Sequence, residues 1–215
     1  MIILQKTNHN YYISQKIIQL KGNNMNLKIY LFRHGQTTYN RDKKFTGFHN
    51  PGLTNLGKKQ AQKIAKILKN RKFQVAFYTR LKRSKQTLKK VLKYHPECKT
   101  LIKDDRMIER GYGKLQGLSH DKIIKKYGNE QFEIWHRSFY VPPPKGESFA
   151  MVETRVASFI KFLKIYMKKN KINVAISAHG NSIRLFRKIM EKSSIRETTS
   201  WFIPYDKVFV YNLRV

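Results

Sequence analysis

Two short polar motifs follow apolar stretches of the sequence, and their residue types could handle a phosphoryl group. RHG (residues 33–35) comes directly after the apolar run LKIYLF, and HGN (residues 179–181) comes directly after INVAISA. One histidine–glycine pair at the end of a strand is more often structural than catalytic. Two such pairs, one preceded by arginine and the other followed by asparagine, favour a reactive site.

Two further segments add an arginine and a carboxylate to this set. TRLKRSKQT contains Arg83 and follows another short apolar run, and IERGYGKLQG contains Glu109. Glu109 is the only acidic residue in these motifs, so it is the candidate for acid–base work.

Together these residues suit phosphoryl transfer without a metal ion. Arg33 and Arg83 would bind the oxygens of the phosphoryl group. Their charge would also keep the imidazole of His34 neutral, so that one ring nitrogen can attack phosphorus. His179 would donate a hydrogen bond to the transferring group, and Glu109 would protonate the leaving oxygen. The sequence has no cluster with the spacing of a metal site, so no metal is expected.

The periodicity of the apolar residues predicts the elements that bring these motifs together. Short apolar runs predict strands at 27–32, 74–79, 172–178 and 207–213. Apolar residues at helical spacing predict helices at 54–69 (capped by Thr54), 82–94, 120–127 (capped by Ser119), 152–167 and 181–190. This alternation predicts an α/β fold, a three-layer αβα sandwich with a mostly parallel central sheet.

Parallel strands place their carboxyl ends at one edge of the sheet, and ligands of such folds bind there. We therefore expect the four motifs to meet at that edge. No G-x-G-x-x-G follows a strand, which argues against a dinucleotide site, and neither G-x-S-x-G nor a Walker loop occurs.

The composition is that of a folded protein without a membrane span. Of the 215 residues, 40% are hydrophobic and 13% aromatic, and the single cysteine, Cys98, fits a reducing compartment, so a cytoplasmic location is expected. The net charge of +32 would attract polyanions, but the lysines are spread along the chain without a nucleic-acid-binding signature. A small phosphorylated substrate is therefore the expected partner, rather than nucleic acid or a membrane. We expect residues 1–24 to be a loosely ordered extension and residues 25–215 to form the catalytic domain.

The motifs, in order, resemble those of the histidine phosphatase superfamily. They are LFRHGQTTYN, FTG, TRLKRSKQT, ERGYGKLQGL, YGNEQFEIWHRSFYVPPP and SAHGNSIR. More closely, they look like its 2,3-bisphosphoglycerate-dependent phosphoglycerate mutase branch, over nearly everything after Met25. The resemblance implies a phosphoglycerate mutase-like fold and an isomerase of glycolysis and gluconeogenesis that interconverts 2- and 3-phosphoglycerate through a phosphohistidine. It also implies 2,3-bisphosphoglycerate as the primer, no metal, and a homodimer or homotetramer.

The same resemblance implies roles for individual residues. His34 would carry the phosphoryl group and Glu109 would donate and accept the proton, with Arg33, Arg83 and His179 around the phosphoryl group. The substrate pocket would be formed by Thr37, Asn40, Thr46, Gly47, Arg110, Tyr112, His120, His136, Arg137, Gly180 and Asn181, with Arg137 binding the distal carboxylate or phosphate.

Three features depart from the family pattern. The branch usually has a lysine after LQGL, where this chain has Ser119-His120, and two arginines after the tryptophan, where it has His136-Arg137. The long segment that usually follows the proline run is missing, since PPPKGESF passes directly to the next helix. Losing two cations and a cover should favour hydrolysis of the phosphoenzyme.

Alternatives to the mutase therefore remain at this point. One is a histidine-type phosphatase that hydrolyses small phosphorylated metabolites, and another is a basic, non-catalytic binding module. If His120 and His136 do bind the substrate anion, its affinity should improve as the pH falls from about 8 to 6.

Overall fold

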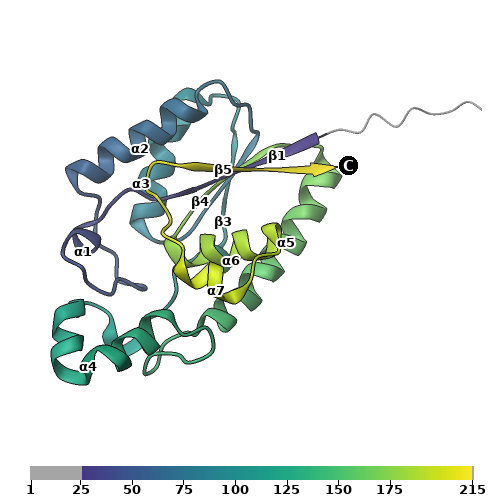
Figure 1. Cartoon of the computed structure of the whole chain (residues 1–215). Coiled ribbons are helices and arrows are strands. Elements are labelled where there is room, and N and C mark those ends of the chain that lie inside the picture. The colour runs from purple at the N-terminus through teal and green to yellow at the C-terminus, as the bar shows by residue number, and fades with distance from the viewer. Residues whose placement is uncertain (1–25, 215) are drawn as a thin grey trace, which may run out of the picture.

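The computed structural model describes residues 26–214, which form a five-stranded sheet between two layers of helices (Figure 1). The strands lie in the order β3-β2-β4-β1-β5, and all neighbours are parallel except β1 and β5. Their bounds are β1 (Asn26–Arg33), β2 (Val75–Tyr78), β3 (Thr100–Lys103), β4 (Val174–Ala178) and β5 (Val208–Arg214). The expected α/β fold with a mostly parallel sheet is confirmed, whereas the expectation for residues 1–24 lies outside the described residues.

The helices are distributed over both faces and one edge of this sheet. In Figure 1, α2 and α3 lie on one side of the sheet and α5 and α6 on the other. The α-helices are α1 (Thr38–Arg41), α2 (Asn55–Leu68), α3 (Lys82–Val91), α4 (His120–Arg137), α5 (Phe149–Asn170), α6 (Gly180–Glu191) and α7 (Ile195–Ser200). Three 3-10 turns, η1 (Leu92–Tyr94), η2 (Asp105–Met107) and η3 (Gly113–Leu115), lie in the connections.

Alternating side chains of the strands explain why helices cover both faces. In β1, Ile29 and Leu31 belong to the apolar core shared with α5 and α6. Tyr30 and Phe32 point the other way, into the core shared with α2 and α3. Because both faces are apolar, each needs a helical layer to exclude water.

The elements that the sequence did not predict are short or lack an apolar pattern. β3 is an edge strand with mostly exposed side chains, and α1 and α7 contain only four and six residues. The helix expected to end at Tyr127 is followed by a second helical segment. The two are joined at Gly128, whose φ of +83° is a left-handed conformation that suits glycine.

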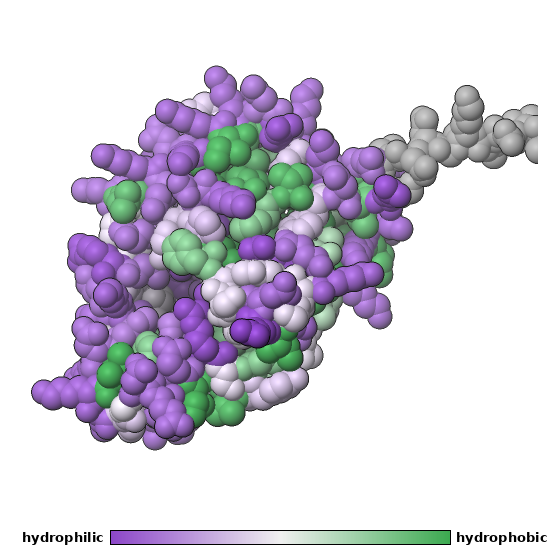
Figure 2. Space-filling model, in the orientation of Figure 1, coloured by the Kyte–Doolittle hydropathy of each residue, from purple (hydrophilic) through white to green (hydrophobic). Residues whose placement is uncertain are grey.

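α4 lies apart from the sheet and forms an outer wall near its carboxyl edge (Figure 1). It is held there by a separate apolar cluster that includes Phe45, Tyr112, Ile123 and Phe132. Hydrophilic residues cover most of the face shown in Figure 2, in line with the high lysine content. None of the helices within residues 26–214 has the length and apolarity needed to cross a bilayer.

Candidate active site

β1 and β4 end side by side, and this brings the two histidine motifs together. Arg33 stands opposite Ala178 in the parallel register, and the His34 N–H donates to the Ala178 carbonyl at 3.0 Å. The ring centroids of His34 and His179 are 5.0 Å apart, and both side chains are almost completely buried. The expected meeting of strand ends therefore places two imidazoles in contact at one edge of the sheet.

The hydrogen bonds of His34 define which ring nitrogen carries a lone pair. The Nε of Arg83 donates to His34 Nε2 at 3.1 Å, and a guanidinium can only donate. His34 Nε2 is therefore the unprotonated nitrogen, and Nδ1–H donates to the Gly35 carbonyl at 2.7 Å. This assignment makes Nε2 the ring nitrogen that could act as a nucleophile.

Burial and nearby charge keep both imidazoles neutral. The pKa of His34 is lowered well below its usual range, first by burial and then by the charges of Arg83 and Arg33. The pKa of His179 is lowered for the same reasons, burial first. Burial also lowers the pKa of Arg83 to about 10, which leaves its guanidinium charged at neutral pH. Neutral imidazoles beside permanent cations are what nucleophilic attack on a phosphate ester requires.

Arg83 is fixed by three hydrogen bonds. Besides His34, it donates to the carbonyls of His49 at 2.8 Å and Gly47 at 2.9 Å. Gly47 has a φ of +49°, and a Cβ there would collide with the side chain of Gln116, so this close loop needs glycine. The loop thereby determines where the buried charge of Arg83 lies.

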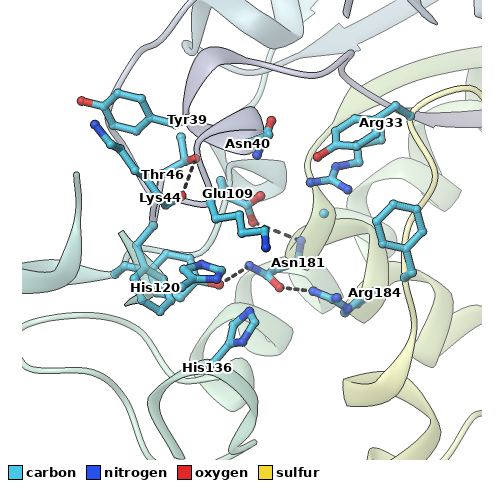
Figure 3. Close-up of a pocket in the computed structure, with 17 residues that line it drawn as sticks. Arg33, Tyr39, Asn40, Lys44, Thr46, Glu109, His120, His136, Asn181 and Arg184 are labelled. Carbon is cyan, nitrogen blue, oxygen red and sulfur yellow. Dashed lines mark hydrogen bonds between the residues drawn. The ribbon is translucent and has the colours of Figure 1, made fainter. Parts of the chain in front are cut away.

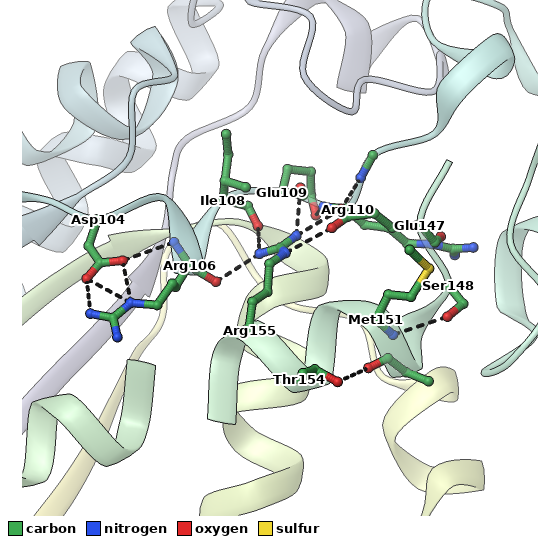
Figure 4. Close-up of polar contacts among 12 residues, drawn as sticks. Asp104, Arg106, Ile108, Glu109, Arg110, Glu147, Ser148, Met151, Thr154 and Arg155 are labelled. Carbon is green, nitrogen blue, oxygen red and sulfur yellow. Dashed lines mark hydrogen bonds and ion pairs between the residues drawn. The ribbon is translucent and has the colours of Figure 1, made fainter. Parts of the chain in front are cut away.

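Glu109 is held in place by its own carboxylate and by the backbone around it. Its Oε1 accepts a hydrogen bond from the N–H of Arg110 at 2.9 Å. It also accepts one from the N–H of Asn181 at 3.0 Å, which is drawn in Figure 3. Arg155 of α5 donates to the carbonyls of Arg106, Ile108 and Glu109 and pairs with Glu147 at 3.0 Å (Figure 4). Arg155 thus fixes the path of the segment that carries this carboxylate.

The atoms of His34, Glu109 and His179 that could bind a ligand all lie within 4.8 Å of one another. Two histidines and a glutamate at this distance would suit a divalent cation by residue type. However, the lone pair of His34 Nε2 already accepts from Arg83, and Arg33 adds a second positive charge. The electrostatics of the cluster therefore favour an anion over a cation.

Two buried polar atoms at this centre have no hydrogen-bond partner among residues 26–214: Arg33 Nε and His179 Nδ1. The other nitrogen of His179, Nε2, lies 2.8 Å from the hydroxyl of Thr79. In the tautomer in which Nε2 accepts from Thr79, Nδ1 carries a hydrogen and can donate. Because buried polar groups are rarely left unpaired, these two atoms indicate where oxygens of a phosphoryl group would bind.

A cavity of about 230 Å³ opens beside these residues (Figure 3). Its volume suits a small metabolite, since pockets for drug-sized ligands measure roughly 300–1,000 Å³. Most of the expected site residues line it: Arg33, Asn40, Thr46, Gly47, Glu109, Tyr112, His120, His136, Gly180 and Asn181. His34, Arg83 and His179 are buried next to this wall rather than in it.

The structure places three of the expected pocket residues outside the cavity wall. Thr37 is fully buried and caps α1. Arg137 donates to the Thr199 carbonyl at 3.2 Å and does not line the cavity. Arg110 is also fully buried, and it donates to the carbonyls of Glu147, His136 and Trp135. Its guanidinium therefore contacts backbone carbonyls, and its expected contact with substrate stays a prediction.

The far end of the cavity contains the two imidazoles that replace the expected cations. The rings of His120 and His136 lie 5.2 Å apart and contact Phe45 and Phe132. Burial, followed by the charge of Arg137 among others, lowers the pKa of His136 to about 3. Burial also lowers the pKa of His120. A pKa of about 3 leaves His136 uncharged between pH 8 and 6, and the lowered pKa of His120 opposes a gain of charge on that ring.

The cavity wall also includes residues that the sequence analysis did not select. Arg184 lies one helical turn after Gly180 in α6, so the helical period after HGN could have identified it. Lys43 lines the cavity from a left-handed position with a φ of +47°. Its charge, like that of Arg137, lowers the pKa of His120. Tyr205 and Phe202 come from a loop without any periodic signal.

Sequence comparisons match most of the chain to one family. The model of the histidine phosphatase superfamily (branch 1) matches residues 29–213. A 2,3-bisphosphoglycerate-dependent phosphoglycerate mutase of Buchnera aphidicola subsp. Cinara cedri is 36% identical over 213 residues, which cover 86% of this chain and 92% of that protein. The protein of the same name from Pseudoalteromonas atlantica is 30% identical over 207 residues, covering 84% and 91%.

Solved structures with this fold include phosphatases. A mycobacterial glucosyl-3-phosphoglycerate phosphatase superposes with a TM-score of 0.71 at 24% identity, over 81% of this chain and 84% of that one. An α-ribazole phosphatase from Shigella flexneri gives 0.74 at 21% identity, over 86% and 89%. At these identities the likeness shows the shared fold alone.

Proposed function

The chain is an enzyme of the histidine phosphatase superfamily, and we propose that it interconverts 2-phosphoglycerate and 3-phosphoglycerate through a phosphohistidine at His34. The observation that carries this proposal is the state of His34: a neutral, buried ring whose Nε2 holds a lone pair between two guanidiniums and close to Glu109. The names of the relatives support the choice of phosphoglycerates as substrate.

The geometry supports a two-way transfer at His34. In one direction, Nε2 attacks phosphorus, the ester P–O bond breaks, and the leaving oxygen takes a proton from Glu109. In the other, a substrate hydroxyl gives its proton to Glu109 and attacks phosphorus. The P–N bond then breaks, and its electron pair returns to Nε2. Arg33, Arg83 and His179 would stabilise the charge on the phosphoryl oxygens in both directions.

The unpartnered nitrogens of Arg33 and His179 fit an anionic primer such as 2,3-bisphosphoglycerate. Arg33, His179 and Asn181 would hold its reacting phosphate, and Lys43 and Arg184 its other end. When bound, this compound supplies the phosphoryl group that loads the enzyme.

A phosphatase of small phosphorylated metabolites is the second candidate. It is favoured by the neutral imidazoles of His120 and His136, which hold a second acidic group less firmly than permanent cations would. The same phosphohistidine then passes its phosphoryl group to water.

One assay separates the two candidates. The formation of 2-phosphoglycerate from 3-phosphoglycerate is followed with enolase, with and without 2,3-bisphosphoglycerate, while free phosphate is measured in parallel. The mutase predicts isomerisation that exceeds phosphate release and depends on the primer. Phosphate release above isomerisation under all conditions would refute the mutase and favour the phosphatase.

A further inference from the structure

The loop between α7 and β5, residues 201–207, passes over the end of the cavity that lies beside Arg33 and His34. We call this end the reaction end, and the end beside His120 and His136 the distal end. Two of its side chains, Phe202 and Tyr205, line the cavity, although the loop lies far along the sequence from the histidine motifs of β1. Nothing in the expected set of site residues comes from this part of the chain. The loop therefore adds a wall to the reaction centre that the motifs do not describe.

Residues of the active-site region hold this loop at several points. Arg184 donates to the Trp201 carbonyl at 2.9 and 2.6 Å, and Arg33 donates to the Ile203 carbonyl at 2.7 Å. Ile203 itself is buried, and Lys63 of α2 pairs with Asp206 at 2.7 Å. With both ends attached, the ring of Tyr205 has a defined position.

That position is directly over the guanidinium of Arg33. The Arg33 Cζ lies 4.0 Å from the centroid of the Tyr205 ring, a cation–π contact. Gly180 lies close to the same guanidinium, because a Cβ on Gly180 would come within 3.3 Å of it. Arg33 is thus confined by an aromatic ring and by the start of α6.

The confinement leaves one buried nitrogen of Arg33 for a ligand. Nη1 donates to Ile203, whereas Nε is buried without a partner among the described residues. The ring of Tyr205 also lies 6.4 Å from the ring of His34, centroid to centroid. Tyr205 therefore stands beside the place where phosphorus would be attached and forms part of the cavity wall there.

We propose that Tyr205 positions Arg33 against the phosphoryl group and keeps water from the phosphohistidine. This inference rests on the proposed chemistry at His34. In hydrolysis, water gives a proton to Glu109 and attacks phosphorus. The P–N bond then breaks, its electron pair returns to Nε2, and free phosphate leaves. Tyr205 slows this step by occupying the approach to phosphorus, in a chain whose sequence lacks the longer segment after the proline run.

The test compares Tyr205→Ala, Tyr205→Leu and Tyr205→Phe with the unaltered protein. Tyr140→Ala is the matched control, because Tyr140 is an exposed tyrosine that does not line the cavity. Each protein is loaded with labelled 2,3-bisphosphoglycerate, and the acid-labile phosphohistidine is followed after rapid quenching in alkali. Inorganic phosphate is titrated separately by calorimetry, which reports on the guanidinium of Arg33 without turnover.

The Ala variant should lose phosphohistidine about tenfold faster and bind phosphate about tenfold more weakly, in line with a cation–π contact of roughly 1–2 kcal/mol. The Leu variant restores bulk without a π face, so it should recover much of the phosphohistidine lifetime but not the phosphate affinity. The Phe variant should match the unaltered protein in both, since the ring alone is needed.

Three results would overturn the proposal, and a fourth would overturn its premise. An unchanged lifetime in the Ala variant excludes shielding, and an unchanged phosphate affinity excludes positioning. A Phe variant as impaired as the Ala variant assigns the effect to the hydroxyl and refutes stacking. Absence of labelled histidine in the unaltered protein would instead refute the phosphohistidine itself, while the calorimetric comparison would still decide whether Tyr205 positions Arg33.

Discussion

The two ends of the cavity are built differently. At the reaction end, Arg83 and Glu109 are buried, and each is held by hydrogen bonds from or to defined backbone groups. At the distal end, two imidazoles of lowered pKa pack against phenylalanines, and Lys43 contributes its charge from an exposed position. The reaction end is thus strongly charged and fixed to backbone groups by hydrogen bonds, whereas the distal end is largely aromatic.

This difference separates the chemistry from the choice of substrate. Transfer of a phosphoryl group needs the same charges in the same places whatever alcohol carries it. Recognition of the rest of the substrate depends on the distal wall alone. Substitutions at the two ends should therefore have effects of different size and kind, and kinetic constants should reveal which end was altered.

The largest effect is expected from His34→Gln, which removes the nucleophile. Activity toward phosphoglycerate should fall by about 10,000-fold or more, because the neighbouring imidazole of His179 has its Nε2 against the Thr79 hydroxyl rather than facing the ligand. Steady-state rates measure the loss, and circular dichroism serves as the control for folding. Retention of more than a few per cent of the activity would show that another residue carries the phosphoryl group.

Glu109→Gln should give the next largest effect, a fall in kcat of about 100- to 10,000-fold, because the amide cannot exchange the proton. KM should change little, since Gln keeps an oxygen that accepts from the N–H of Asn181. The rate of the same variant can be compared on two substrates. Phosphoglycerate releases an alcohol, which is a poor leaving group, and nitrophenyl phosphate releases nitrophenol, which is a good one. If the substitution lowers the rate by the same factor on both substrates, Glu109 acts on something other than the leaving oxygen.

His136 at the distal end should also lower the free energy of unfolding in acid. The pKa of His136 is about 3 in the folded chain, below its ordinary value of 6.5, so the unfolded state binds more protons between these values. Stability is therefore lost as the pH falls from about 6.5 toward 3, by about 1–2 kcal/mol from this group at pH 5. Denaturant unfolding at pH 7 and 5 should show a smaller loss in His136→Phe.

A smaller effect is expected for Lys43→Gln. KM for 3-phosphoglycerate should rise about fivefold with kcat unchanged, as for one exposed ion pair. Lys145→Gln is the matched control, because Lys145 has a similar left-handed φ, +59° against +47°, and lies outside the cavity. An equal change in the two variants would assign the effect to the backbone, and a fall in kcat would place Lys43 at the reaction end.

The last prediction is that a substitution at the distal end leaves the pH dependence of substrate binding as it is. Because the pKa of His136 is lowered to about 3, its ring gains almost no charge between pH 8 and 6, and His136→Phe should leave the pH dependence of phosphoglycerate affinity unchanged. Calorimetric titrations at pH 6, 7 and 8 compare the two proteins. A gain in affinity toward pH 6 that disappears in the variant would show that the imidazole does bind as a cation.

The reaction end could be predicted from the sequence because its residues follow strands. Strand direction determines where His34 and His179 lie, so local patterns were sufficient to bring them together. The contacts of Arg110 could not be predicted, because the motif that contains it cannot show that backbone carbonyls surround the guanidinium. Tyr205 and Lys43 were missed because they lie on irregular segments, whose positions are determined by tertiary contacts rather than by periodicity.

Arg110 also links the two ends mechanically. Its guanidinium holds the carbonyls of Trp135 and His136 in the outer wall, and its own N–H donates to the carboxylate of the preceding residue, Glu109. A displacement of the outer wall would therefore reach the Glu109 carboxylate through one residue, by its side chain on one side and its backbone N–H on the other.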